Sequence, residues 1–145
     1  MIFIPQRIFI HHSLTKDTPT VSWGAIRKYH TETLHWSVIG YHAGVELVRS
    51  GSELYYEVLM GRMWDRQGAH CRGQNHDSLG ICLIGNFDNY RPPDAQLDAA
   101  GRIIILWMKL YGIKLKDIYG HNEFDSNKTC PGKLFDFDDL KHYIF

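Results

Sequence analysis

The stretch RIFIHH, residues 7–12, lies at the centre of the fold that the sequence predicts. Its β-branched and aromatic residues predict a buried strand, which Pro5 precedes and Ser13 follows. A second short apolar run, SLGICLIGNF at residues 78–87, predicts another buried strand. Both segments belong to the sheet that we expect at the centre of the molecule.

Helical patterns alternate with these strands. The clearest is PPDAQLDAAGRIIILWMKLYG, residues 92–112, because prolines stand at its start and Gly112 at its end. Residues 21–32 predict another helix, with Ser22 as its N-cap. The last residues, 135–145, predict a short terminal helix.

Two further strands are expected at residues 38–47 and 51–61, with a turn at residues 50–52 between them. The chain has neither an internal repeat nor a glycine-rich phosphate loop. Alternating strands and helices predict the α/β class, with a mixed central sheet that carries helices on its faces. A chain of 145 residues most simply forms a single domain, residues 1–145.

Charge and composition exclude several classes of partner. The formal net charge is +0, so we expect no binding of nucleic acid or of anionic membranes. No apolar run approaches the roughly 20 residues of a membrane span, so we expect no membrane insertion. The N-terminus lacks the basic and apolar regions of a signal peptide, which predicts a cytoplasmic location in the producing cell. We expect the protein to be a monomer.

Three polar stretches between the predicted elements carry histidines, at residues 11–18, 66–78 and 120–132. Connecting segments are where catalytic and binding residues concentrate. The chain has three cysteines, an odd number at wide spacing, so we do not expect a disulfide framework. A site that combines histidine with cysteine is therefore the candidate in these stretches.

The third stretch, GHNEFDSNKTCPG, places His121, Lys128 and Cys130 close together, and His11 or His12 ends the first strand. Strand alternation lets only one of two neighbouring histidines face a common site. Two imidazoles and a thiolate are a known ligand set for catalytic zinc, with a fourth position left for water. On spacing alone the favoured interpretation is a structural one, with a half-buried His121, a packed Cys130 and a solvated Lys128.

Four sequence motifs favour the zinc site over the structural interpretation. In order along the chain they are IFIHHSLT, IGYHAGVE, GAHCRGQNHDSLGICLIGNF and GHNEFDSNKTCPG. Their order and approximate spacing resemble those of the zinc-dependent N-acetylmuramoyl-L-alanine amidases, a family that includes peptidoglycan recognition proteins and small phage lysozymes. The similarity extends over residues 7–137 and is greatest to the short, single-domain phage lysozymes. It implies a phage or prophage endolysin that cleaves the amide bond between N-acetylmuramic acid and L-alanine in peptidoglycan.

The resemblance also implies roles for particular residues. By motif, one Zn²⁺ per chain would be held by His11, His121 and Cys130. Tyr41 matches the catalytic tyrosine of the family and would assist proton transfer, because an amide nitrogen leaves poorly unless it is protonated. Lys128 matches the catalytic lysine of the phage enzymes and would stabilise the oxyanion of the tetrahedral intermediate.

The resemblance places His70 and Asn75 in the wall of the substrate groove, where they would contact the sugar or the stem peptide. Asn75 could equally fix its own loop through an Asx-type turn. His12 would have a packing or supporting role. His42 and His76 would be structural.

Other interpretations predict a different use of Cys130. A peptidoglycan-binding module of the recognition-protein type is the main alternative, although the non-catalytic members lack the metal-binding cysteine. A cysteine hydrolase based on Cys130 and His121 would need an oxyanion hole and an orienting group, for which the sequence offers no candidate. Structural zinc would need four protein ligands. The chain also has Cys82 where the cytoplasmic recycling amidases of this family have a glutamate, which favours the phage branch.

Overall fold

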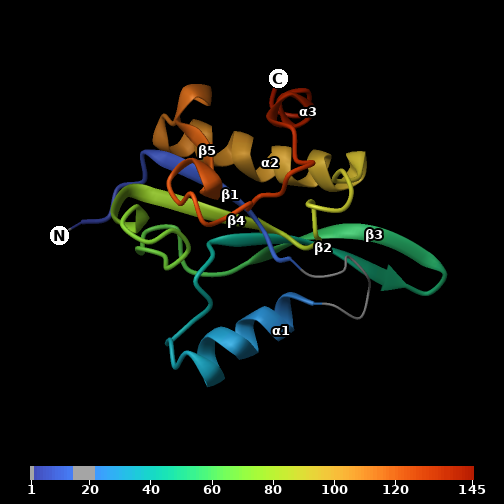
Figure 1. Cartoon of the computed structure of the whole chain (residues 1–145), viewed down its shortest axis with the longest axis horizontal. Coiled ribbons are helices and arrows are strands. Elements are labelled where there is room, and N and C mark those ends of the chain that lie inside the picture. Colours follow the sequence, from blue (N-terminus) through green and yellow to red (C-terminus); the bar gives the residue numbers. More distant parts are fainter. Residues whose placement is uncertain (1, 15–21) are drawn as a thin grey trace.

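Five strands form one mixed sheet among residues 2–14 and 22–145, which are the residues that the computed structural model describes. The strands are β1 (Arg7–His12), β2 (Ala43–Ser50), β3 (Glu53–Met60), β4 (Ser78–Leu83) and β5 (Ile118–Gly120). They lie in the order β3-β2-β4-β1-β5 (Figure 1). β1 is parallel to β4 and β5, β2 is parallel to β4, and β3 is antiparallel to β2. The predicted α/β class with a mixed central sheet is confirmed.

Helices cover both faces of this sheet (Figure 1). Helix α2 (Asp94–Tyr111) and the short helix α3 (Phe137–Lys141) lie on one face. Helix α1 (Trp23–Lys28) lies on the other and continues into a π-helical turn, η1 (Tyr29–Thr33). Single turns of 3-10 helix complete the described part: η2 (Asn75–Asp77), η3 (Leu115–Asp117) and η4 (His121–Glu123).

The two faces of β1 and β4 carry different side chains, because successive residues of a strand point to opposite sides. Ile8 and Ile10 of β1 pack with the core under α2. The same core takes three residues of β4, namely Leu79, Ile81 and Leu83. The opposite face of β4 presents Ser78, Gly80 and Cys82. This row of small residues leaves space above the sheet on the α1 side.

The ends of the helices follow from local sequence. Ser22 Oγ accepts a hydrogen bond from the Ala25 backbone N–H at 3.2 Å, which confirms the predicted N-cap of α1. Pro93 precedes α2 in an extended conformation, and Gly112 ends the helix in the left-handed region at φ 69°. Val21, the first residue of the predicted helix 21–32, lies outside the described residues, as do residues 15–18 of the first polar stretch.

Several predicted boundaries were wrong. β2 begins at Ala43 and not at residue 38, because the preceding residues bond to loop 61–69: the carbonyls of Gly40 and Tyr41 accept from Ala69 N and Arg62 N. β4 ends at Leu83, short of residue 87. α1 ends at Lys28. The three-residue strand β5 was missed.

Within the described part of the chain, no helix is long and apolar enough to cross a membrane.

Candidate active site

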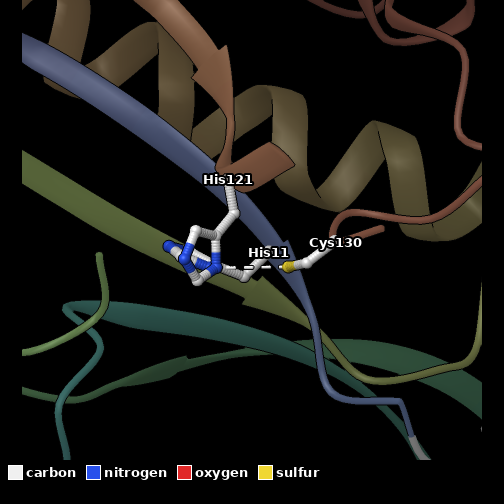
Figure 2. A group of neighbouring side chains, drawn as sticks. All are labelled: His11, His121 and Cys130. Carbon is white, nitrogen blue, oxygen red and sulfur yellow. Dashed lines mark hydrogen bonds between the residues drawn. The ribbon is translucent and has the colours of Figure 1, made fainter. Parts of the chain in front are cut away.

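The parallel arrangement of β1 and β5 brings two histidines together. Ile10 of β1 pairs with Gly120 of β5, so His11 and His121 both follow that pair at the carboxyl ends of neighbouring strands. Carboxyl ends of parallel strands are the usual place for a site in an α/β sheet. Figure 2 shows the His121 ring projecting from the residue after β5 toward the His11 ring, and the two ring centroids lie 4.8 Å apart.

The third side chain, Cys130, returns to β1 at the end of the polar loop. Its Sγ accepts a hydrogen bond from the His12 backbone N–H at 3.3 Å, and its carbonyl accepts from Asn122 N at 2.7 Å. The Sγ lies 3.6 Å from His11 Nδ1, a contact that the dashed line in Figure 2 marks. The sulfur atom is therefore fixed from two sides, by β1 and by the start of its own loop.

One ligand atom from each of His11, His121 and Cys130 lies within 4.8 Å of the other two. Donor atoms in a tetrahedral zinc site lie about 3.3–3.8 Å apart, so small side-chain movements would close this triangle onto an ion. Two imidazoles and a thiolate suit zinc better than they suit Mg²⁺ or Ca²⁺, which prefer oxygen. The structure thus brings the three predicted ligands into a group that is able to hold a metal ion.

Before a metal binds, the side chains of His11, His121 and Cys130 are all uncharged at neutral pH. Burial, and then the neighbouring His70 and His121, hold the pKa of His11 well below its ordinary value. Burial also lowers the pKa of His121, although Asp125 opposes this. Burial raises the pKa of the Cys130 thiol to about 12. At neutral pH both imidazoles are free to coordinate, and a metal ion that binds must displace the thiol proton.

A cavity of about 590 Å³ opens onto the three side chains. Its lining combines the end of β1, the helical segment α1–η1, Tyr41 and the polar loop. Ile26, Tyr29 and His30 form part of its wall, and we did not assign any of them to the site from the sequence. The sequence gives one indication for two of these residues: Ile26 and His30 lie on the same face of the predicted helix. A volume of this size is ordinary for a ligand pocket.

Tyr41 lies two residues before β2 and lines this cavity. The ring centroid is 5.2 Å from that of His11 and 5.8 Å from that of His30. Burial raises the pKa of Tyr41 well above its ordinary value, and a hydrogen bond from its hydroxyl to Cys82 adds to this. The hydroxyl therefore stays protonated across the physiological range, and its single hydrogen is directed to Cys82.

Lys128 is exposed and lines the same cavity from the polar loop. The loop is tied to the chain after β4 through Asp88. Asp88 accepts from Thr129 Oγ1 and from the Lys133 backbone N–H, each at 2.9 Å. Since these two residues flank Cys130, Asp88 fixes the part of the loop that carries both the thiol and the lysine.

His70 and Asn75 are not among the residues that line the cavity. The His70 side chain is buried, and both ring nitrogens have partners inside the protein. Asn75 Oδ1 accepts from the backbone N–H groups of His70 and Cys71, each at 2.9 Å. The structure therefore shows Asn75 fixing its own loop, one of the two roles considered for it, and substrate contact by either side chain stays a prediction.

His12 and His42 have the structural surroundings that the sequence predicts for them. His12 points to the α2 side, where its Nδ1 accepts from Phe87 N at 3.1 Å. His42 is fully buried, with Nδ1 accepting from Gly80 N at 3.0 Å and Nε2 lying 2.7 Å from the Arg66 carbonyl. His12 also borders the cavity, but His11 is the histidine of β1 that groups with His121 and Cys130, next to Cys82 of β4.

The family model of N-acetylmuramoyl-L-alanine amidase matches residues 4–133. The chain belongs to this family. The endolysin of Escherichia phage T7 is 33% identical over 130 residues, which are 86% of this chain and 78% of the relative. Peptidoglycan-recognition protein 1 of Holotrichia diomphalia is 30% identical over 135 residues, 90% of this chain and 66% of the relative.

A solved structure agrees with the sequence comparisons. The N-acetylmuramoyl-L-alanine amidase LysC from Clostridium intestinale URNW superimposes with a TM-score of 0.77 at 27% identity, covering 97% of this chain and 85% of that one. The resemblance that the four motifs predict is confirmed, and the protein is an N-acetylmuramoyl-L-alanine amidase.

Proposed function

We propose that this amidase is a zinc-dependent endolysin that cleaves the amide bond between N-acetylmuramic acid and L-alanine in peptidoglycan. One Zn²⁺ would be held by His11, His121 and Cys130. The observation that carries the proposal is that these three donors, Tyr41 and Lys128 all line one cavity. When bound, the ion supplies Lewis-acid chemistry, because zinc polarises a carbonyl group and lowers the pKa of water.

Tyr41 would serve proton transfer. The leaving group is an amide nitrogen, which departs poorly as an anion and therefore needs a proton as the C–N bond breaks. The Tyr41 hydroxyl is held beside the His11 ring, and its raised pKa keeps it a hydrogen-bond donor at neutral pH. To donate to the leaving nitrogen, the hydroxyl would have to release the hydrogen bond that it makes to Cys82.

Lys128 would stabilise negative charge. The carbonyl oxygen gains charge as the tetrahedral intermediate forms, and a fixed cation nearby lowers the energy of that state. The ammonium group lies at the exposed edge of the cavity, on a loop segment that Asp88 holds in place. A substrate that covers this edge would remove water around the ammonium and so strengthen the interaction.

The glycan strand and stem peptide would occupy the 590 Å³ cavity between η1 and the polar loop. Contacts of His70 and Asn75 with the sugar or the peptide would require a groove that extends beyond this cavity, since neither residue lines it. Like the phage endolysins to which it is similar, the enzyme would act on the cell wall from inside the producing cell once the membrane has been opened.

Purified sacculi provide the test. Amidase cleavage releases new N-terminal alanine, whereas cleavage of the glycan would release new reducing sugar ends. We expect alanine without reducing ends, reversible loss on chelation and recovery with Zn²⁺. Peptidoglycan binding without alanine release by the zinc-loaded protein would instead identify a recognition-type binding module.

A further inference from the structure

His11, one of the proposed metal ligands, contacts a second buried histidine, His70. His11 Nε2 lies 3.0 Å from His70 Nδ1, and the two residues are only 1% and 8% exposed. A hydrogen bond between two ring nitrogens requires one to donate and the other to accept. Its direction decides which nitrogen of His11 keeps a lone pair for a metal.

Ser78 sets that direction. His70 Nε2 lies 3.3 Å from the Ser78 carbonyl oxygen and 3.3 Å from Ser78 Oγ. The carbonyl can only accept, and the hydroxyl already donates its hydrogen to the Gln74 carbonyl at 2.7 Å. Both groups therefore accept from His70, so its ring hydrogen is on Nε2. The Nδ1 atom of a neutral His70 is left as an acceptor.

His11 must then donate from Nε2, which leaves the lone pair on Nδ1. That atom is the one 3.6 Å from Cys130 Sγ. We propose that His70 is a positioning residue which, with Ser78 behind it, holds His11 in the Nε2–H tautomer so that Nδ1 faces the metal. The proposal rests on the proposed zinc site and assigns His70 a role other than substrate contact.

The surroundings of His70 hold its ring in this one place. A Cβ atom at Gly80 would come within 2.5 Å of His70 Cγ, and one at Gly68 within 2.8 Å of its Cδ2. The Asn75 side chain binds the His70 backbone N–H, and the His42 ring packs edge-on at 5.8 Å. Glycines on two sides and two polar neighbours thus enclose a ring that faces His11 and not the cavity.

Zinc affinity measured by competition with a chromophoric chelator tests the proposal without any substrate. His70→Ala removes the acceptor for His11, and we expect about 10–100-fold weaker zinc binding. Asparagine carries Oδ1 close to the position of His70 Nδ1, so His70→Asn should bind zinc within about threefold of wild type. Ile104→Ala, in the core on the other face, should lower stability and leave zinc affinity unchanged.

Ring-nitrogen NMR of the zinc-loaded wild type provides a second readout. Long-range ¹⁵N–¹H correlations should show hydrogens on Nε2 of both His11 and His70. Because this measurement uses no variant, it decides the proposal even where His70→Ala does not fold. A hydrogen on His70 Nδ1, or wild-type zinc affinity in a folded His70→Ala, would overturn it.

The outcomes also separate this proposal from the proposed function. Alanine release by wild type, together with unchanged zinc affinity in His70→Ala, would reject the positioning role alone. Weakened zinc binding in His70→Ala, with no alanine release from any zinc-loaded form, would reject the amidase mechanism and leave the positioning role intact.

Discussion

The two faces of the sheet are built from different kinds of side chain. Under α2 and α3 lies a large apolar core that combines both helices with β1, β2 and β4. Under α1, among the residues that the structure describes, the buried apolar cluster consists of Trp23, Ile39, Cys82 and Ile84. Buried histidines fill much of the remaining space on that side, and hydrogen bonds hold them.

This difference separates stability from chemistry. Burial of apolar area contributes about 25 cal/mol per Å², so the α2 face, which carries the larger apolar core, provides the larger hydrophobic stabilisation. Buried imidazoles contribute little hydrophobic stabilisation, and they need specific hydrogen-bond partners to remain neutral and oriented. At neutral pH we therefore expect changes on the α2 face to act mainly on unfolding, and changes on the α1 face to act mainly on metal binding and turnover.

The largest effect should come from Cys130→Ser. Serine keeps the size of the side chain, but its hydroxyl stays protonated at neutral pH and is a poor zinc ligand. The variant should remain folded, lose zinc and lose amide cleavage by more than about 10³-fold, while it still binds peptidoglycan fragments weakly. A melting curve, a zinc assay and alanine release measure these three properties.

Cys71→Ser is the matched control, because Cys71 is equally buried and lies outside the site. It should keep zinc and activity. Unfolding of Cys130→Ser alone would mean that the metal holds this face together, since metal-binding energy would then be folding energy. The separation of the two faces would be wrong in that case.

Ile104→Ala tests the other face. Ile104 is fully buried in α2, and truncation should lower the unfolding free energy by about 3 kcal/mol through lost burial and a residual cavity. Urea unfolding measures the loss, and zinc content with alanine release at 25 °C should match wild type. A folded variant with impaired zinc binding would show that the two faces are coupled.

Tyr41→Phe and Lys128→Ala should each keep zinc and lose roughly 10²-fold in turnover, because neither side chain is proposed to hold the metal. The initial rate of alanine release, at equal zinc content, measures the effect. Tyr55→Phe and Lys109→Ala, both at exposed positions, serve as controls with wild-type rates. Near-normal turnover in Tyr41→Phe or Lys128→Ala would disprove the role given to that residue.

The smallest effect concerns pH and His42. Burial lowers the pKa of His42 to about 4, although its bond to the Arg66 carbonyl opposes this. The unfolded chain therefore binds more protons between about pH 6.5 and pH 4, so stability is complete above that window and falls as pH falls through it. Between pH 7 and pH 5 this residue should account for about 2 kcal/mol of lost stability.

His42→Gln should remove that share of the pH dependence. Unfolding free energies at pH 7 and pH 5, compared between variant and wild type, measure it directly. An equal loss in both proteins would show that His42 does not contribute to the acid sensitivity of this face.

The sequence predicted the α2 face better than the α1 face, for a physical reason. The helix at residues 92–112 and the strand at 7–12 depend on local apolar patterns, which the chain carries in its own spacing. β5 has three residues and forms because it pairs with β1, more than a hundred residues earlier in the chain, so no local pattern indicated it. β2 began late because Gly40 and Tyr41 bond to a distant loop.

Residue types were easier to predict than their partners. Alternation along β1 indicated that one of His11 and His12 faces the site, but not which one, because the side covered by α2 is a tertiary property. Family resemblance supplied the choice. The hydrogen bond between His11 and His70 joins residues 59 positions apart, and no spacing rule could have indicated it.

The row of small side chains on β4 has a consequence for how the protein tolerates mutation. Leu79, Ile81 and Leu83 face an apolar core, where other aliphatic residues of similar volume fit at modest cost. Ser78, Gly80 and Cys82 lie against the rings of His70 and Tyr41, where any larger residue displaces a functional ring. A saturation library of this strand should therefore show a tolerance of period two, with permissive and restrictive positions alternating along six consecutive codons.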